Sequence, residues 1–180
     1  MSRDSLEERF AQWLASLVKD KAAMATLRHG LGKPPGTFYQ MDKYVLKFLG
    51  GESEESYYPP YYLIASLFAF WHQGRDSVEP NPPVNFGDSL RLLVDKEAVS
   101  SNRDEAEKRI EKRLVALLNC HYDDLSEHLR HLISLLKSKD IPVNWAQLLR
   151  DIKSWNREDH VVQKTWARSF WVGPRKSEML

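Results

Sequence analysis

Three histidines and two aspartates lie close together in the second half of the chain, and their side chains are the ones best suited to metal binding. His128 and His131 are three residues apart and could share a zinc ion if both lay on one helix. Their spacing does not match the H-E-x-x-H pattern, and His121-Tyr122-Asp123 is not the adjacent His-Asp pair of metal phosphohydrolases. On a helix that starts at Asp124, both later histidines lie beside or opposite the apolar face. We therefore expect solvated histidines and no metal site.

Nucleophilic chemistry and phosphate-loop chemistry have equally little support. Cys120 and His121 are adjacent in the sequence, a spacing that seldom lets a thiol and an imidazole face each other. No serine lies in a G-x-S-x-G elbow, and Gly30–Lys33 is too short for a phosphate-binding loop. We expect Cys120 to be a buried structural thiol. The sequence predicts no catalytic residues and no cofactor, so the protein is not expected to be an enzyme.

Basic side chains are placed more regularly, along the flanks of expected helices, where they could bind phosphate groups. On the helix expected after Asp104, three basic residues lie on one flank of the apolar face, and Lys164 with Arg168 forms an i,i+4 pair near the C-terminus. An alternative is a solvated surface in which Glu105 pairs with Arg109. The candidate nucleic-acid-binding residues are Arg28, Lys33, Arg109, Lys112, Arg113, Arg130, Lys137 and Arg150.

The six tryptophans divide into core and surface candidates. Trp13, Trp145, Trp155 and Trp166 fall on or near apolar faces, so we expect them in the core. Trp171 lies opposite Val162 on its expected helix. It is therefore the best candidate for an exposed residue at a partner interface.

Length and composition restrict the class of protein. The 180 residues suffice for one compact domain or two small lobes, and 42% hydrophobic with 28% charged residues is typical of a globular chain. The longest apolar run, Tyr61–Trp71, is shorter than the roughly 20 residues of a membrane span, and the polar start has no secretory core. A single cysteine suggests a reducing compartment. We expect a cytoplasmic protein with no membrane partner.

The net charge of +1 limits the case for nucleic-acid binding, because stand-alone binders are usually strongly basic. Residues 1–100 carry 11 Lys and Arg against 13 Asp and Glu, whereas residues 101–180 carry 15 against 12. The excess of positive charge is therefore local. Any polyanion contact should follow a short stretch of surface, with other subunits supplying the remaining charge.

Helical periodicity dominates the chain, and no segment alternates convincingly with period two. Ser5 with Glu8 predicts a capping box, and Tyr61–His72 is apolar on nearly every side, as in a buried central helix. We also expect helices over Asp20–His29, Thr37–Leu49 and Glu158–Val172 and a short helix around Leu90. Three further helices are expected to start at the capping residues Asp104, Asp124 and Asn144.

The predicted fold class is all-α, a compact helical bundle of about eight to nine helices in two packed lobes. Gly and Pro residues between Gln73 and Asn85 predict the connection between the lobes. The expected division is an N-terminal helical lobe over residues 1–72, a Pro/Gly-rich connecting loop over 73–85, a C-terminal helical lobe over 86–172 and a flexible tail over 173–180.

Several segments, in this order and spacing, resemble a known family. They are Phe10–Leu14, Ala25–Gly32, Asn85–Arg91, Lys112–Leu118, Leu129–Ile133, Val143–Trp155 and Trp166–Trp171. Each segment alone is a leucine-rich helical pattern of low specificity. Together they resemble the CasB-like small subunit of the type I-E CRISPR surveillance complex, Cascade.

The resemblance implies an all-helical, non-catalytic subunit of a guide RNA-containing complex, present as two copies head to tail. Its implied partners are the backbone subunits, the large subunit, a second copy of itself, and the target and displaced DNA strands of an R-loop that it stabilises. Family basic positions match at Arg28, Lys112, Arg113, Arg130 and Arg150. His29 and His131 stand where some relatives have a second arginine, which weakens any phosphate contact there near neutral pH. The alternative is a helical assembly clamp that bridges the backbone and large subunits without touching nucleic acid.

Overall fold

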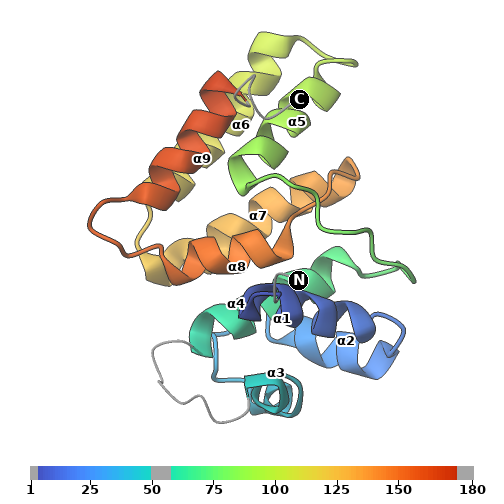
Figure 1. Cartoon of the computed structure of the whole chain (residues 1–180). Coiled ribbons are helices and arrows are strands. Elements are labelled where there is room, and N and C mark those ends of the chain that lie inside the picture. The colour runs from blue at the N-terminus through green and yellow to red at the C-terminus, as the bar shows by residue number, and fades with distance from the viewer. Residues whose placement is uncertain (1–3, 50–57, 174–180) are drawn as a thin grey trace. The chain divides into compact units, whose positions relative to one another are not determined.

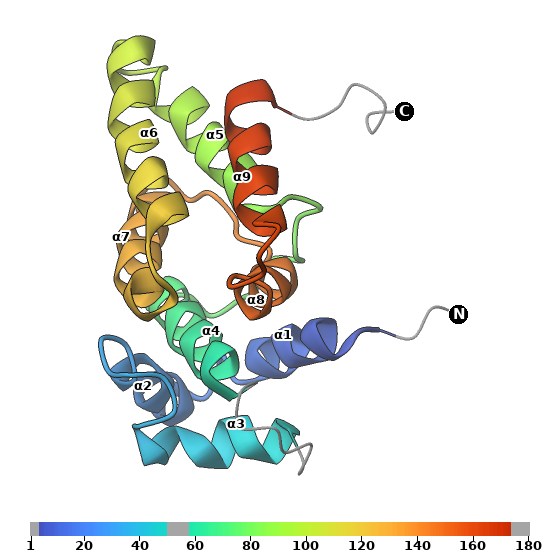
Figure 2. The same ribbon diagram turned by 90° about the vertical axis from the view of Figure 1, so that its left-hand side faces the viewer.

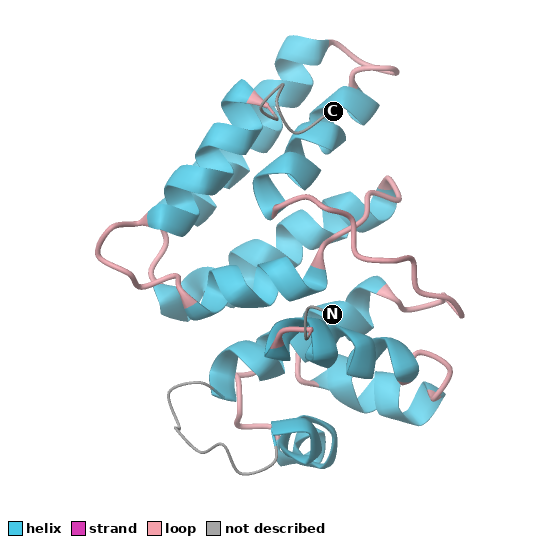
Figure 3. Ribbon diagram, viewed as in Figure 1, coloured by secondary structure: helices cyan, strands magenta, loops and turns pink. Residues whose placement is uncertain are grey.

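The computed structural model describes residues 4–49 and 58–173. In those residues it contains nine α-helices and two 3-10 helices but no strand (Figures 1 and 3). The predicted all-α class is therefore confirmed. The chain divides into two compact units. The first unit comprises Met1–Asn81 with Trp145–Lys153, and the second comprises Pro82–Asn144 with Ser154–Leu180.

The first unit is built around one hydrophobic helix. Its helices are α1 (Leu6–Ser16), α2 (Lys21–His29), α3 (Asp42–Leu49), α4 (Tyr58–Trp71) and α8 (Trp145–Lys153), with a 3-10 turn at Tyr39–Met41. Helix α4 packs against α2, α3 and α8, and α1 also packs against α8. A helix that is apolar all round must be covered on every side, and α4 is buried along nearly its whole length.

Aromatic rings fill the space around α4. The Tyr61 ring meets the ring of Phe10 on α1 edge-on, with centroids 4.9 Å apart. The Phe68 ring meets Trp145 of α8 in the same way at 5.5 Å. The prediction of a buried central helix is confirmed, although α4 begins at Tyr58 and not at Tyr61. Its prolines lie in the first turn, where a missing N–H costs no hydrogen bond.

The second unit contains four helices. They are α5 (Phe86–Glu97), α6 (Arg103–Asn119), α7 (Leu125–Ser138) and α9 (Val161–Val172), with a 3-10 turn at Tyr122–Asp124. Figure 2 shows α5 between α6 and α9, and α7 packs against both α5 and α6. Helices α5 and α9 approach closely at Gly87, where an added Cβ would overlap backbone atoms of Trp166.

Three predicted helix starts are wrong. Helix α3 begins at Asp42, after the 3-10 turn at Tyr39–Met41, and not at Thr37. Helix α6 is capped by Asn102, whose side chain accepts from the N–H groups of Asp104 and Glu105. Helix α7 begins directly after Asp124, as expected. The Asp124 side chain makes no capping hydrogen bond, and the 3-10 turn at Tyr122–Asp124 leads into the helix. Helix α9 begins at Val161, not Glu158, because His160 adopts left-handed backbone angles of φ 50° and ψ 35°.

The grouping of α8 differs from the predicted lobes. The expected C-terminal lobe over residues 86–172 includes Trp145–Lys153, whereas in the structure this segment belongs to the first unit, where α8 packs against α1 and α4. Its apolar face carries Trp145, Leu149 and Ile152, which are all buried. Most of the predicted tail, from residue 174, lies outside the described residues. Across 4–49 and 58–173, no helix is both long enough and apolar enough to cross a membrane.

Candidate nucleic-acid interface

Helix α6 holds two of the predicted phosphate-binding residues in exposed positions. Its apolar face, formed by Ala106, Ile110, Leu114 and Leu117, is buried in the second unit. Lys112 lies on the side of the helix opposite Ile110 and Leu114 and is exposed, and Arg113 is exposed as well. The helix therefore presents both charges on a rigid element anchored by its opposite side.

Helix α7 presents Arg130 in the same manner. Leu129 and Ile133 are completely buried, and Arg130 beside them is exposed. Since α7 packs against α6, all three exposed cations lie on two neighbouring helices of one unit. Lys137, two turns after Arg130 on the same flank of α7, is half-buried and interacts with other groups of the protein.

The side chains of Lys112, Arg113 and Arg130 have no ion-pair or hydrogen-bond partner among residues 4–49 and 58–173. An exposed cation without an internal carboxylate keeps its full charge for an external anion, and it releases a counterion when a phosphate binds. This distinguishes the three residues from Arg109, Lys137 and Arg150, which interact with other groups of the protein.

Arg109 is already neutralised inside the second unit. Its guanidinium pairs with the carboxylate of Glu97, whose side chain is only 10% exposed at the end of α5. The alternative pairing with Glu105, expected from the i,i+4 spacing, is not the one observed. Arg109 thus joins α6 to α5.

Arg28 and Lys33 belong to the first unit. Arg28 is half-buried in the last turn of α2, where a cation interacts favourably with the helix dipole. Lys33 lies in the following turn with its ammonium 3.9 Å from the centre of the Phe38 ring. Such a cation–π contact leaves the charge uncompensated, so both residues stay candidates.

Arg150 joins α8 to the start of α1. Its guanidinium donates to Glu8 at 3.1 Å and to the hydroxyl oxygen of Ser5 at 2.9 Å, and it lies 3.9 Å from Glu7. Lys153 on the same helix donates to Glu7 at 2.7 Å. Burial acts to raise the pKa of Glu7, but the hydrogen bonds that its carboxylate accepts, that of Lys153 above all, together with the charge of Lys153 outweigh burial and lower that pKa. This network gives Arg150 a structural role.

Trp171 is exposed, as its position opposite Val162 predicts. Its side chain is 42% exposed, and its indole N–H donates to Glu111 of α6 at 3.0 Å. Val172 beside it is 73% exposed. The end of α9 therefore presents an apolar surface held in place by a hydrogen bond, while its use as a partner interface stays a prediction.

The residues considered for metal or nucleophilic chemistry are not gathered into a site. His121 and His131 are exposed and His128 is half-buried. Throughout the two described ranges, no group of three or more potential ligands could hold a metal ion. Cys120 is half-buried, whereas the sequence predicts a buried thiol. Burial, aided by the nearby charge of Asp124, raises the pKa of its thiol to about 11, which disfavours the thiolate.

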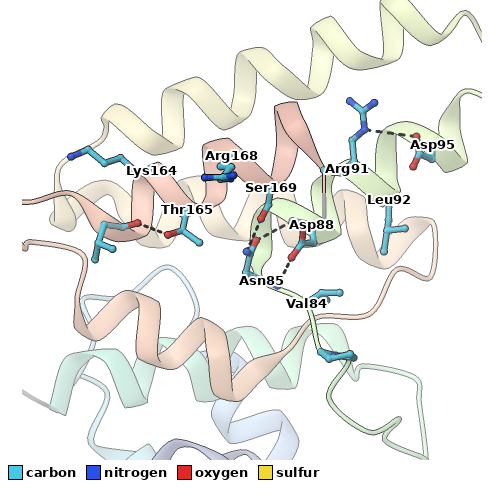
Figure 4. Close-up of a pocket in the computed structure, with 13 residues that line it drawn as sticks. Val84, Asn85, Asp88, Arg91, Leu92, Asp95, Lys164, Thr165, Arg168 and Ser169 are labelled. Atoms are coloured by element: carbon cyan, nitrogen blue, oxygen red, sulfur yellow. Dashed lines mark hydrogen bonds and ion pairs between the residues drawn. The ribbon is translucent and has the colours of Figure 1, made fainter. Parts of the chain in front are cut away.

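A second set of cations escaped the sequence prediction. Arg91, Lys164 and Arg168 line a groove between α5 and α9 (Figure 4). The i,i+4 spacing of Lys164 and Arg168 is visible in the sequence. Nothing local in the sequence indicates that α9 packs on the helix that carries Arg91, so the groove could not be predicted.

The sequence profile of the family described as CRISPR-associated protein Cse2 matches residues 23–171. The CRISPR-associated protein Cse2 of Thermus thermophilus is 31% identical to the chain over 169 residues, which cover 91% of this chain and 89% of the relative.

Solved structures give the same result. The crystal structure of CasB from Thermus thermophilus is similar with a TM-score of 0.72 and 30% identity, covering 94% of this chain and 99% of that one. CasB from M. ruber has a TM-score of 0.73 and 27% identity over 98% of both chains. A chain of a CRISPR RNA-guided surveillance complex has the same fold, with a TM-score of 0.73 at 22% identity over 92% of this chain and 91% of that one.

Proposed function

The chain belongs to the CRISPR-associated Cse2 family, and from this membership we propose that it is a non-catalytic small subunit of a CRISPR RNA-guided surveillance complex of type I-E. The fold that it shares with a chain of such a complex supports the assignment. In this role it contacts the backbone subunits, the large subunit and a second copy of itself. No step of catalysis is assigned to it.

Within the complex, the subunit binds the sugar-phosphate backbone of the target and displaced DNA strands and stabilises the R-loop. The observation that carries this proposal is a set of three exposed cations on α6 and α7 that have no ion-pair or hydrogen-bond partner within the described part of the chain: Lys112, Arg113 and Arg130. Exchange of a DNA duplex for an RNA–DNA hybrid is nearly balanced in free energy, so a few phosphate contacts decide whether the strands stay apart. Such contacts do not discriminate between base sequences; the guide RNA recognises the target sequence by base pairing.

The low net charge of +1 agrees with a subunit that acts only inside an assembly. Three phosphate contacts give weak binding to an isolated protein. Once the complex holds the DNA beside the subunit, the same contacts form at a high effective concentration and contribute much more.

The test is charge reversal in the reconstituted, guide-loaded complex. Lys112→Glu, Arg113→Glu and Arg130→Glu are combined, and the dissociation rate of target DNA is measured at several salt concentrations. We expect faster dissociation with complex assembly unchanged. A matched control reverses three exposed cations of the first unit, Arg9, Lys19 and Lys43, and so changes the net charge equally. Dissociation rates equal to those of the unaltered complex would remove the R-loop role.

A second candidate function is an assembly clamp without nucleic-acid contact. The exposed Trp171 and Val172 at the end of α9 favour it. In that case Trp171→Ala would abolish incorporation of the subunit into the complex, while reversal of the α6 and α7 cations would change neither assembly nor DNA binding.

A further inference from the structure

A groove between α5 and α9 is a surface feature of the second unit that the proposed DNA contacts do not use. The groove has a volume of about 750 Å³ and is lined by residues of both helices and of the segment that leads into α5 (Figure 4). None of its lining residues belongs to α6 or α7. It is therefore a separate candidate site on the same unit.

The lining includes apolar side chains that have no cover. Leu92 is 44% exposed and Val161 is 45% exposed, and Val84 lies half-buried at the entrance of α5. Figure 4 shows Val84 and Leu92 on the α5 side and Lys164, Thr165 and Arg168 on α9. Apolar groups in a concave surface gain free energy when a partner excludes water from them.

The acidic side chains of the groove are already satisfied. Asp88 accepts a hydrogen bond from the backbone N–H of Asn85 at 2.9 Å in a capping box. Asp95 pairs with Arg103 at 2.6 Å and lies 4.0 Å from Arg91. Neither carboxylate therefore needs an external cation.

The basic side chains of α9 keep their charge. Arg168 is exposed and has no side-chain partner among the described residues. Lys164 donates to the backbone oxygen of Asp159 at 2.7 Å, and the carboxylate of that residue is paired with Arg157 at 2.6 Å. The groove thus combines exposed apolar side chains with two positive charges, of which that of Arg168 has no carboxylate partner among the described residues.

We propose that this groove binds an acidic amphipathic segment of another protein subunit. The apolar side chains of the segment cover Leu92 and Val161, and its carboxylates pair with Arg168 and Lys164. A nucleic-acid strand fits less well, because the lining contains no aromatic ring for base stacking and because a sugar-phosphate backbone has no apolar side chains to cover Leu92 and Val161. The inference rests on the proposed membership of an assembly and names the surface through which one partner is held.

The direct test places a photo-crosslinking amino acid, benzoylphenylalanine, at Leu92 of the full chain. The variant is co-expressed with guide RNA and the subunits encoded beside it, and the purified complex is irradiated and analysed by peptide mass spectrometry. We expect a crosslink to an acidic amphipathic segment of a different protein subunit. The same crosslinker at Val99, which is 87% exposed and lies outside the groove, is the control and should not capture that segment.

The other outcomes separate this inference from the proposed function. A crosslink to nucleic acid or to a second copy of the chain, or no crosslink in an assembled complex, would overturn the groove proposal and leave complex membership intact. A chain that never co-purifies with the complex would overturn both.

The contribution of the two positive charges, those of Lys164 and Arg168, can be measured separately. Lys164→Glu with Arg168→Glu should weaken incorporation of the subunit about tenfold, since opposed charges now face the segment. Replacing an acidic residue of the crosslinked segment by lysine should restore incorporation. The single variant Lys19→Glu, in the first unit, is the control for a general effect of charge. Normal incorporation of the double variant would contradict the proposed role of the two cations.

Discussion

The guanidinium of Arg109 on α6 pairs with the carboxylate of Glu97 at the end of α5, where that carboxylate is only 10% exposed. Removal of the cation leaves this largely buried carboxylate without its partner. We therefore expect Arg109→Ala to lower the free energy of unfolding by about 1–2 kcal/mol. Urea unfolding followed by circular dichroism measures the change. Lys112→Ala, which removes an exposed cation of the same helix, should change the free energy of unfolding by less than about 0.5 kcal/mol. Equal effects of the two substitutions would contradict the structural role of Arg109.

Gly87 lies where α5 touches the backbone of α9. A methyl group at this position would overlap the carbonyl oxygen of Trp166, and backbone atoms cannot move aside as a flexible side chain can. Gly87→Ala should therefore destabilise the protein by about 3 kcal/mol, seen as a lower Tm. At Gly74 the added Cβ meets nothing within 4 Å, so Gly74→Ala incurs only the strain of its φ of 83°, about 1 kcal/mol. A larger loss at Gly74 than at Gly87 would show that the helices are not in close contact.

The ion pair between Glu7 and Lys153 predicts a dependence of stability on pH. The folded state lowers the pKa of Glu7 from 4.5, so its contribution is present above that value and is lost as the pH falls through the lowered pKa. Burial acts to lower the pKa of Lys153, but the hydrogen bonds and charge interactions with Glu7 and Tyr61 together outweigh burial and raise that pKa from 10.5. The contribution of Lys153 is therefore lost only as the pH rises past that value. The unfolding free energy should therefore fall in acid below about pH 4.5. Glu7→Gln should reduce this acid dependence, as urea unfolding at several pH values would show. An unchanged dependence in the variant would contradict the role of the pair.

Cys120 should react slowly with thiol reagents, since burial and the charge of Asp124 raise the pKa of its thiol to about 11. Near neutral pH very little thiolate is present, and the thiolate is the reactive form. The rate of alkylation by iodoacetamide, followed by mass spectrometry, should be well below that of free cysteine and should rise on denaturation. Alkylation of the folded protein as fast as that of free cysteine would contradict this account and reopen the case for a reactive thiol.

Local signals in the sequence predicted local structure well. Ser5 and Glu8 form both hydrogen bonds of the expected capping box, because each partner is three residues from the other. The predicted start of α9 is wrong because the left-handed backbone conformation of His160 depends on its surroundings. The residue type alone does not indicate that conformation.

The candidate site was harder to predict for a related reason. Helical periodicity indicates which basic residues leave the core, and it placed Lys112, Arg113 and Arg130 correctly on the surface. It does not indicate which acids lie opposite them after folding. Arg150 pairs with residues more than 140 positions away in the chain, and only the packing of α8 on α1 brings them together.

The central claim is that the cations of α6 and α7 contact phosphate groups. The most direct measurement is the salt dependence of target-DNA binding by the assembled complex, with the triple variant Lys112→Ala, Arg113→Ala and Arg130→Ala compared with the unaltered protein. Each lost contact to a single strand should reduce the slope of log K against log salt by about 0.7, and three lost contacts should reduce it by about 2. Identical slopes for the two complexes would contradict the claim.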